Sequence, residues 1–146
     1  MSLDSGMQIG FKGTLTKTVS AQDIADFARV SGDSQPLHLD STYGEATRFK
    51  ARIAHGTILI GLISGVLGTK LVGSDKTVVF LGLSLRFVKP TYIGDTVTAT
   101  CEITKIRQDK PIITLACSCA NQTGEVLIEG EATVLIDPMP FVPLSA

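Results

Sequence analysis

The sequence predicts a single α+β domain in which an antiparallel sheet curls around one buried helix. Three observations support this: a length of 146 residues, a long apolar segment near the middle of the chain, and strand-like alternation after it. A chain of this length can bury an adequate core, so residues 1–146 are expected to form one domain. Hydrophobic residues make up 44% and charged residues 18%, which is far from the composition of disordered chains.

The first part of the chain predicts one strand and one helix. Residues 14–20 alternate weakly between apolar and polar side chains, as a strand does. Ser20 is a residue type that caps helices, with Asp23 three residues further on, and apolar residues then recur at helical spacing until Gly32. This helix therefore leads the chain directly to Asp33.

A long apolar helix is predicted over about 57–71. It is hydrophobic on nearly all sides, which is typical of a helix enclosed by other elements. Gly61, Gly65 and Gly68 line one side, and we interpret them as points of close packing between helix and sheet. The apolar run is shorter than the roughly 20 residues needed to cross a bilayer, so no membrane span is expected.

Four strands are predicted after this helix. The segments 77–88, 95–107, 112–121 and 125–136 are rich in Val, Ile, Thr, Leu and Phe with period-two alternation. Residues 121–124 read as the turn of a hairpin between the last two strands. Consecutive strands joined by short turns pair antiparallel, and one early strand plus a buried helix completes the α+β arrangement.

Charge, termini and cysteine content exclude several classes of protein. Thirteen basic and 14 acidic residues give a net charge of −1, and the basic residues are scattered, so the sequence has no electrostatic footprint for nucleic acid. The N-terminus shows no export or transit signal. Three cysteines, an odd number, are interpreted as reduced thiols. We expect a cytoplasmic protein without nucleic-acid or membrane partners.

The segment 31–38, SGDSQPLH, combines two titratable side chains with turn-forming residues. Pro36 holds Gln35 in an extended conformation. Asp33 and His38 are five residues apart across this loop, so both side chains can face one small molecule. Taken alone, the pair also fits a turn-capping aspartate and a hydrogen-bonded structural histidine.

Together with residues 52–56, RIAHG, this segment resembles the signature of the MaoC-like, (R)-specific enoyl-CoA hydratases. The resemblance covers nearly the whole chain, including residues 83–97, LSLRFVKPTYIGDTV. It implies the hot-dog fold and (R)-specific hydration of trans-2-enoyl-CoA, with the reverse dehydration. It implies no cofactor, since coenzyme A or an acyl carrier protein carries the substrate. It also implies that Asp33 and His38 form the catalytic pair that binds water and moves its protons.

Three further residues are predicted to bind substrate. Gly56 precedes the apolar helix, so its amide can point outward with the positive end of the helix dipole behind it, and the family uses the matching glycine to polarise the thioester oxygen. Gln35 stands where the family has asparagine and is one methylene longer. Ser64, two turns beyond Gly56, either bonds back to its helix or reaches the pocket. His55 is interpreted as satisfying nearby polar groups, outside the catalytic pair.

No metal site is expected. Asp33, His38, Asp40 and His55 have no recognised ligand spacing in the sequence. The three cysteines lack the fourth thiolate of a zinc site.

The same residues also leave alternative functions open and predict an oligomeric state. A 3-hydroxyacyl-[acyl-carrier-protein] dehydratase would use the same pair in reverse, and a non-catalytic acyl-thioester-binding domain is favoured by Gln35. A hot-dog thioesterase is disfavoured because residues 57–66 contain no acidic side chain. A hydrophobic sheet with a long edge needs covering, which predicts a homodimer that pairs the sheets of two subunits.

Overall fold

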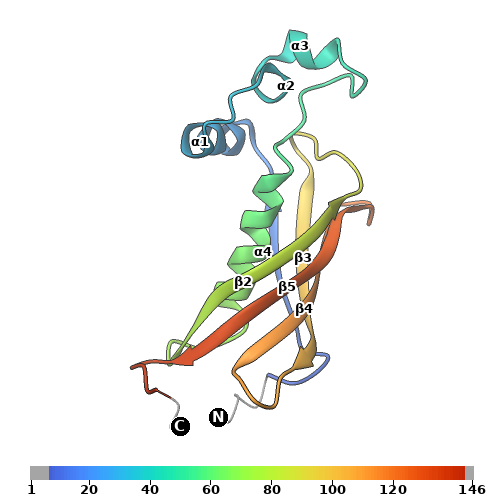
Figure 1. The fold of residues 1–146 in the computed structure, drawn as a ribbon. Coiled ribbons are helices and arrows are strands. Elements are labelled where there is room, and N and C mark those ends of the chain that lie inside the picture. The colour runs from blue at the N-terminus through green and yellow to red at the C-terminus, as the bar shows by residue number, and fades with distance from the viewer. Residues whose placement is uncertain (1–6, 144–146) are drawn as a thin grey trace.

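A computed structural model describes residues 7–143, and its strands and helices follow the predicted order (Figure 1). In chain order these elements are β1 (Lys12–Thr18), α1 (Ala21–Ser31), α2 (Pro36–Leu39), α3 (Ser41–Glu45), α4 (Thr57–Thr69), β2 (Lys76–Phe87), β3 (Thr96–Ile106), β4 (Ile112–Ala120) and β5 (Val126–Pro138). Every predicted strand lies within two residues of the observed bounds. The short helix α2 lies in the predicted loop around Pro36, and α3 lies in residues 40–47, where the sequence favours a short helix.

The described strands form one antiparallel sheet in the order β1-β3-β4-β5-β2. Along β3, alternate residues are buried against α4 and the intervening threonines face the other side of the sheet, as period-two alternation requires. The buried set of β3 is Val97, Ala99, Cys101 and Ile103. The predicted α+β hot-dog class is thus confirmed, with the sheet curled against the apolar helix α4 (Figure 1).

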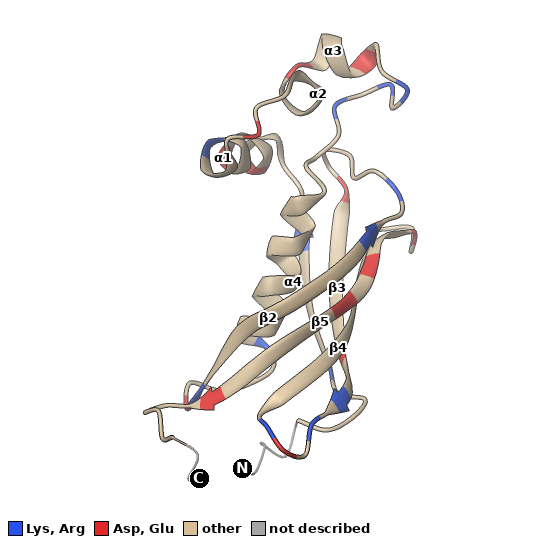
Figure 2. Cartoon of the chain, in the orientation of Figure 1, with Lys and Arg blue, Asp and Glu red and all other residues tan. Residues whose placement is uncertain are grey.

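The covering of α4 is one-sided within a single chain, which corrects the prediction that it is enclosed. Leu59, Ile63, Val66 and Leu67 are buried. Gly61, Ser64 and Gly68 are exposed, and a Cβ added at either glycine would meet nothing within 4 Å. Only Gly65 makes the predicted close approach, with its Cβ position 2.9 Å from Leu15 Cδ1. This exposed face carries no charged residue (Figure 2).

Helix α1 begins and ends as its sequence predicts. The Ser20 side chain accepts from the Asp23 amide, and the Asp23 carboxylate accepts from the Ser20 amide, which is a capping box. Gly32 ends the helix at φ 81°, a left-handed conformation that glycine adopts without steric cost. The chain therefore turns sharply just before Asp33.

Residues 33–56 form an excursion beyond one end of the sheet, carrying α2 and α3 (Figure 1). Its return is anchored by the Ala54 amide, which donates to the Thr91 carbonyl at 2.7 Å, and by a bridge between Ile53 and Tyr92. Gly44 lies against the returning backbone, where a Cβ would be 2.6 Å from the Arg52 nitrogen. The excursion thus folds back onto the start of α4.

Cys101, Cys117 and Cys119 are free, as predicted, and the structure places all three in the buried side of the sheet. Burial raises the pKa of Cys119 to about 12. Hydrogen bonding to Cys117, with burial, raises the pKa of Cys101 as well. These thiols therefore serve as small apolar core residues. Among the described residues, no helix is long and apolar enough to cross a membrane.

Candidate active site

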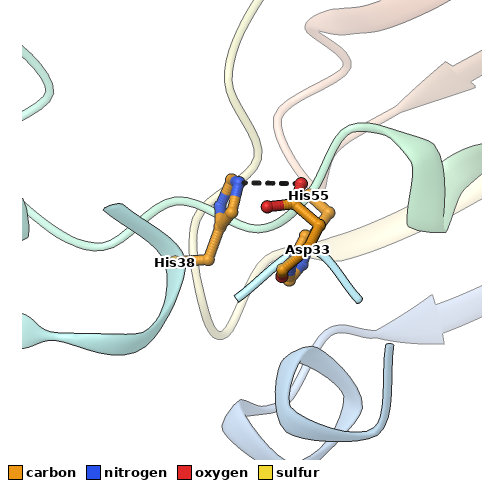
Figure 3. A group of neighbouring side chains, drawn as sticks. All are labelled: Asp33, His38 and His55. Carbon is orange, nitrogen blue, oxygen red and sulfur yellow. Dashed lines mark hydrogen bonds and ion pairs between the residues drawn. The ribbon is translucent and has the colours of Figure 1, made fainter. Parts of the chain in front are cut away.

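Three titratable side chains from separate segments meet where the excursion joins the sheet. Asp33 follows α1, His38 lies in α2, and His55 immediately precedes Gly56 and α4 (Figure 3). One candidate ligand atom from each lies within 4.8 Å of the others. The two predicted catalytic residues are therefore brought together, with a third partner that the sequence interpretation had left outside.

His38 is held in one orientation by its Nδ1 atom. The His38 side chain is only 7% exposed, and Nδ1 lies 2.7 Å from the Ile53 carbonyl. Because a carbonyl oxygen only accepts, Nδ1 must carry the proton. In neutral His38 the Nε2 atom then carries no proton and has a lone pair. The Gln35 side-chain nitrogen lies 3.2 Å from this atom.

Asp33 presents its carboxylate to solvent beside His38. The Asp33 side chain is 44% exposed, and Oδ2 lies 3.9 Å from His38 Nε2 (Figure 3). This separation is too long for a direct hydrogen bond. It suits two groups that share one water molecule. Locally, the Ser31 hydroxyl accepts from the Asp33 amide and Asp33 Oδ1 accepts from the Gln35 amide, which fixes the loop.

His55 contacts both members of the pair. Its Nε2 donates to the Asp33 carbonyl at 2.8 Å, and its ring stacks on His38 with centroids 3.9 Å apart and planes at 28°. Phe27 of α1 packs against the His55 ring, with the two ring centroids 4.8 Å apart. The prediction that His55 satisfies nearby polar groups is confirmed, and the group that it satisfies belongs to the backbone of Asp33. The RIAHG segment was the available signal, but a residue 22 positions from Asp33 can be placed there only by the fold.

Gly56 occupies the N-cap of α4, as predicted, at φ −57°. Its amide has no acceptor among residues 7–143 and adjoins the positive end of α4. A Cβ at this position would be 2.6 Å from the Phe87 ring, so glycine permits the close approach of that ring. Gly56 also lines a cavity of about 320 Å³ with apolar neighbours including Leu59, Phe87 and Ile128. An acyl group could enter beside the Gly56 amide.

Ser64 is not brought to this group in the single chain. It lies on the exposed face of α4, eight residues beyond Gly56, which is about 12 Å along a helix axis. Its role toward substrate stays a prediction.

Asp33, His38 and His55 lie close enough together to be considered as metal ligands, although their spacing in the sequence predicts no metal site. Two histidine nitrogens are committed as donors, His38 Nδ1 to Ile53 and His55 Nε2 to Asp33. The nitrogens left without a proton are His38 Nε2, which the Gln35 side chain approaches at 3.2 Å, and the buried His55 Nδ1. With His38 Nε2 beside the Asp33 carboxylate, the arrangement suits proton transfer.

Known proteins resemble this chain over most of its length. The MaoC-like domain family matches residues 6–119. The chain belongs to the MaoC-like family. An (R)-specific enoyl-CoA hydratase from Aeromonas caviae is 43% identical over 128 residues, covering 88% of this chain and 94% of the relative. A mitochondrial 3-hydroxyacyl-[acyl-carrier-protein] dehydratase from Arabidopsis thaliana is 30% identical, covering 89% of this chain and 78% of that protein.

This MaoC-like domain also resembles a solved structure over most of its length. The (R)-hydratase from A. caviae involved in PHA biosynthesis superposes with a TM-score of 0.84 at 41% identity, covering 90% of this chain and 98% of that chain. The hot-dog assignment therefore holds over most of the chain.

Proposed function

We propose that this MaoC-like protein hydrates trans-2-enoyl-CoA to (R)-3-hydroxyacyl-CoA and catalyses the reverse dehydration. One observation carries the proposal: Asp33 Oδ2 and His38 Nε2 lie 3.9 Å apart, and His55, which bonds to the Asp33 carbonyl, immediately precedes Gly56 in the chain. The hydratase at 43% identity supports the same reaction. The active residues are then Asp33 and His38, with Gly56 and Gln35 at the substrate.

The chemistry follows from where the protons lie. Hydration adds a water oxygen to C3 and a proton to C2, with negative charge developing on the thioester oxygen. Asp33 can hold the water, and the unprotonated Nε2 of His38 can take its proton, because the Nδ1 proton is committed to Ile53. The proton is then returned to C2. The Gly56 amide, backed by the α4 dipole, supports the oxygen charge.

The reaction needs no metal or other cofactor in this proposal, since two titratable groups and one amide supply every step. Coenzyme A is the proposed carrier. The plant relative at 30% identity favours a second candidate, dehydration on acyl carrier protein. Three free buried thiols support a reducing compartment such as the cytoplasm. A thioesterase role remains disfavoured, because α4 carries no acidic residue.

The proposal is tested by incubating purified protein with crotonyl-CoA and longer enoyl-CoA substrates. We expect loss of the enoyl absorbance and formation of the (R)-3-hydroxy product, with rates unchanged after dialysis against EDTA. The same acyl groups on acyl carrier protein decide the carrier. Inactivity across all chain lengths on both carriers would overturn the proposal, and release of free CoA would indicate a thioesterase.

We propose further that the protein acts as a homodimer through β2. This strand is one of the two edges of the sheet, pairing only with β5 among the described strands, and it is long and apolar. Exposed hydrophobic side chains run along it and just beyond: Val79, Phe80, Leu81, Leu83, Phe87 and Val88. An uncovered edge of this kind is a template for pairing with another strand. The β2 strand of a second copy of this chain can pair with this edge, because a two-fold dimer brings the same surface of both subunits together.

A lysine at Leu81 should convert the dimer to a monomer. Leu81 is 52% exposed and sits at the bulge of β2 between Phe80 and Gly82, so its substitution leaves the core intact. Analytical ultracentrifugation should give the mass of two chains for the wild type and of one chain for Leu81→Lys. Ile9→Lys, at a residue 62% exposed away from β2, is the control and should remain dimeric. A monomeric wild type would contradict the proposal.

Gln35→Asn should raise kcat. The shorter amide would withdraw from His38 Nε2, which Gln35 reaches at 3.2 Å, and so release the lone pair for water. Loss of one neutral hydrogen bond, about 1 kcal/mol, corresponds to about a fivefold faster reaction. Steady-state kinetics on crotonyl-CoA measures this, with Gln22→Asn on α1 as an unaffected control. A fall in kcat would show that the glutamine is adapted to this site.

A further inference from the structure

The return segment of the excursion, residues 53–56, contacts both members of the catalytic pair within four residues. The Ile53 carbonyl accepts from His38 Nδ1 at 2.7 Å, and the His55 side chain donates to the Asp33 carbonyl at 2.8 Å. Gly56 follows directly with its amide at the N-terminus of α4. The segment is itself anchored to the sheet through Ala54 and Thr91.

His55 connects the pair in two ways. Its Nε2–H bonds to Asp33, and its ring lies on the ring of His38 with centroids 3.9 Å apart. The His55 residue is 2% exposed and packs against Phe27 of α1, so the ring has little freedom to turn. The Asp33 side chain is 44% exposed, and the hydrogen bond from His55 fixes the backbone that carries it.

The hydrogen bonds set the two stacked histidines in opposite tautomers. His38 carries its proton on Nδ1 because it faces a carbonyl there, and His55 carries its proton on Nε2 for the same reason. His55 Nδ1 is buried and has no hydrogen-bond partner in the described part of the chain. An unpaired buried nitrogen is unfavourable in a core. We therefore take the role of a histidine at position 55 to be the Nε2 hydrogen bond to Asp33 and the stacking on His38.

We infer that His55 is a positioning residue for the hydration reaction: it holds the Asp33 backbone through Nε2–H and keeps the His38 ring in the plane that points Nε2 at the water. This inference rests on the proposed function for its kinetic consequence. The tautomers are a property of the folded protein and can be measured without substrate.

Two variants separate the hydrogen bond from the ring. His55→Phe keeps an aromatic ring against His38 and Phe27 but removes the donor to Asp33. His55→Gln keeps an amide N–H that can reach the Asp33 carbonyl but removes the ring. Ile136→Val, a buried substitution in β5, is the control for loss of core packing and should retain wild-type kcat.

We expect His55→Phe to lower kcat about 10- to 100-fold with a KM close to wild type, because a positioning error of about 1 Å costs that order of rate while substrate binding is unaffected. His55→Gln should recover at least part of that loss. Equal impairment of the two variants, or wild-type kcat in His55→Phe, would overturn the inference in an active enzyme.

Long-range ¹H–¹⁵N spectra of histidine-labelled protein provide the second readout. The sequence contains only two histidines, so the four ring nitrogens can be assigned with His55→Gln. The wild type should show His38 protonated at Nδ1 and His55 at Nε2, and His38 should become a tautomer mixture when His55 is replaced. Any other wild-type pattern would overturn the inference. Inactivity of the wild type on enoyl thioesters, with the expected spectra, would overturn only the proposed function.

Discussion

Asp33→Asn and His38→Asn should each lower kcat for crotonyl-CoA hydration by about 10²- to 10⁴-fold, the range that a positioned acid or base contributes. Asparagine at 33 cannot accept a proton from water. At position 38 its amide can still donate toward Ile53, as Nδ1 does, but it has no basic nitrogen in place of Nε2. Steady-state kinetics with each purified variant measures the loss.

Folding should survive both changes, which makes the kinetic result interpretable. The Asp33 side chain is 44% exposed, and the hydrogen bonds of its backbone do not need a charge on the side chain. Asp109→Asn is the matched control, since that carboxylate pairs with Arg107 in the connection between β3 and β4, away from the site. A residual activity above a tenth of wild type in either variant would remove that residue from the catalytic pair.

Gly130→Ala should have the largest effect on stability. Gly130 of β5 lies opposite Leu85 of β2, and a Cβ there would clash with the Ser84 carbonyl oxygen and lie 2.8 Å from Leu85 Cα. These are backbone atoms, so no side-chain rotation relieves the contact and the strands must separate. We expect a loss of about 3 kcal/mol or more in the free energy of unfolding, at or beyond the upper end for overpacked cores.

The same variant should also lose activity and self-association. β2 carries Phe87, which packs over Gly56, and it is the strand proposed to pair between subunits. Gly68→Ala is the control of opposite sign: nothing lies within 4 Å of its Cβ position, and alanine in a helix is more stable than glycine by about 0.5–1 kcal/mol. Urea denaturation of both variants checks the pair. A Gly130→Ala protein within 1 kcal/mol of wild type would contradict the expected strand separation.

Local patterns determined most of the fold. Period-two alternation located every strand within two residues, and Ser20 with Gly32 marked both ends of α1, because caps and alternation depend on near neighbours in the chain. The same holds for Asp33 and His38, five residues apart in one loop. A feature that is decided within one turn or one strand is visible in the sequence.

The sequence by itself predicted the hot-dog architecture, the closeness of Asp33 and His38, and the glycine that starts α4. Only the tertiary structure decided that His55 joins the pair, that Gln35 reaches His38 Nε2, and that one face of α4 is left uncovered with Ser64 on it. The physical reason is distance along the chain. His55 meets Asp33 across 22 residues, through a return path that α2, α3 and the Ala54–Thr91 hydrogen bond set together.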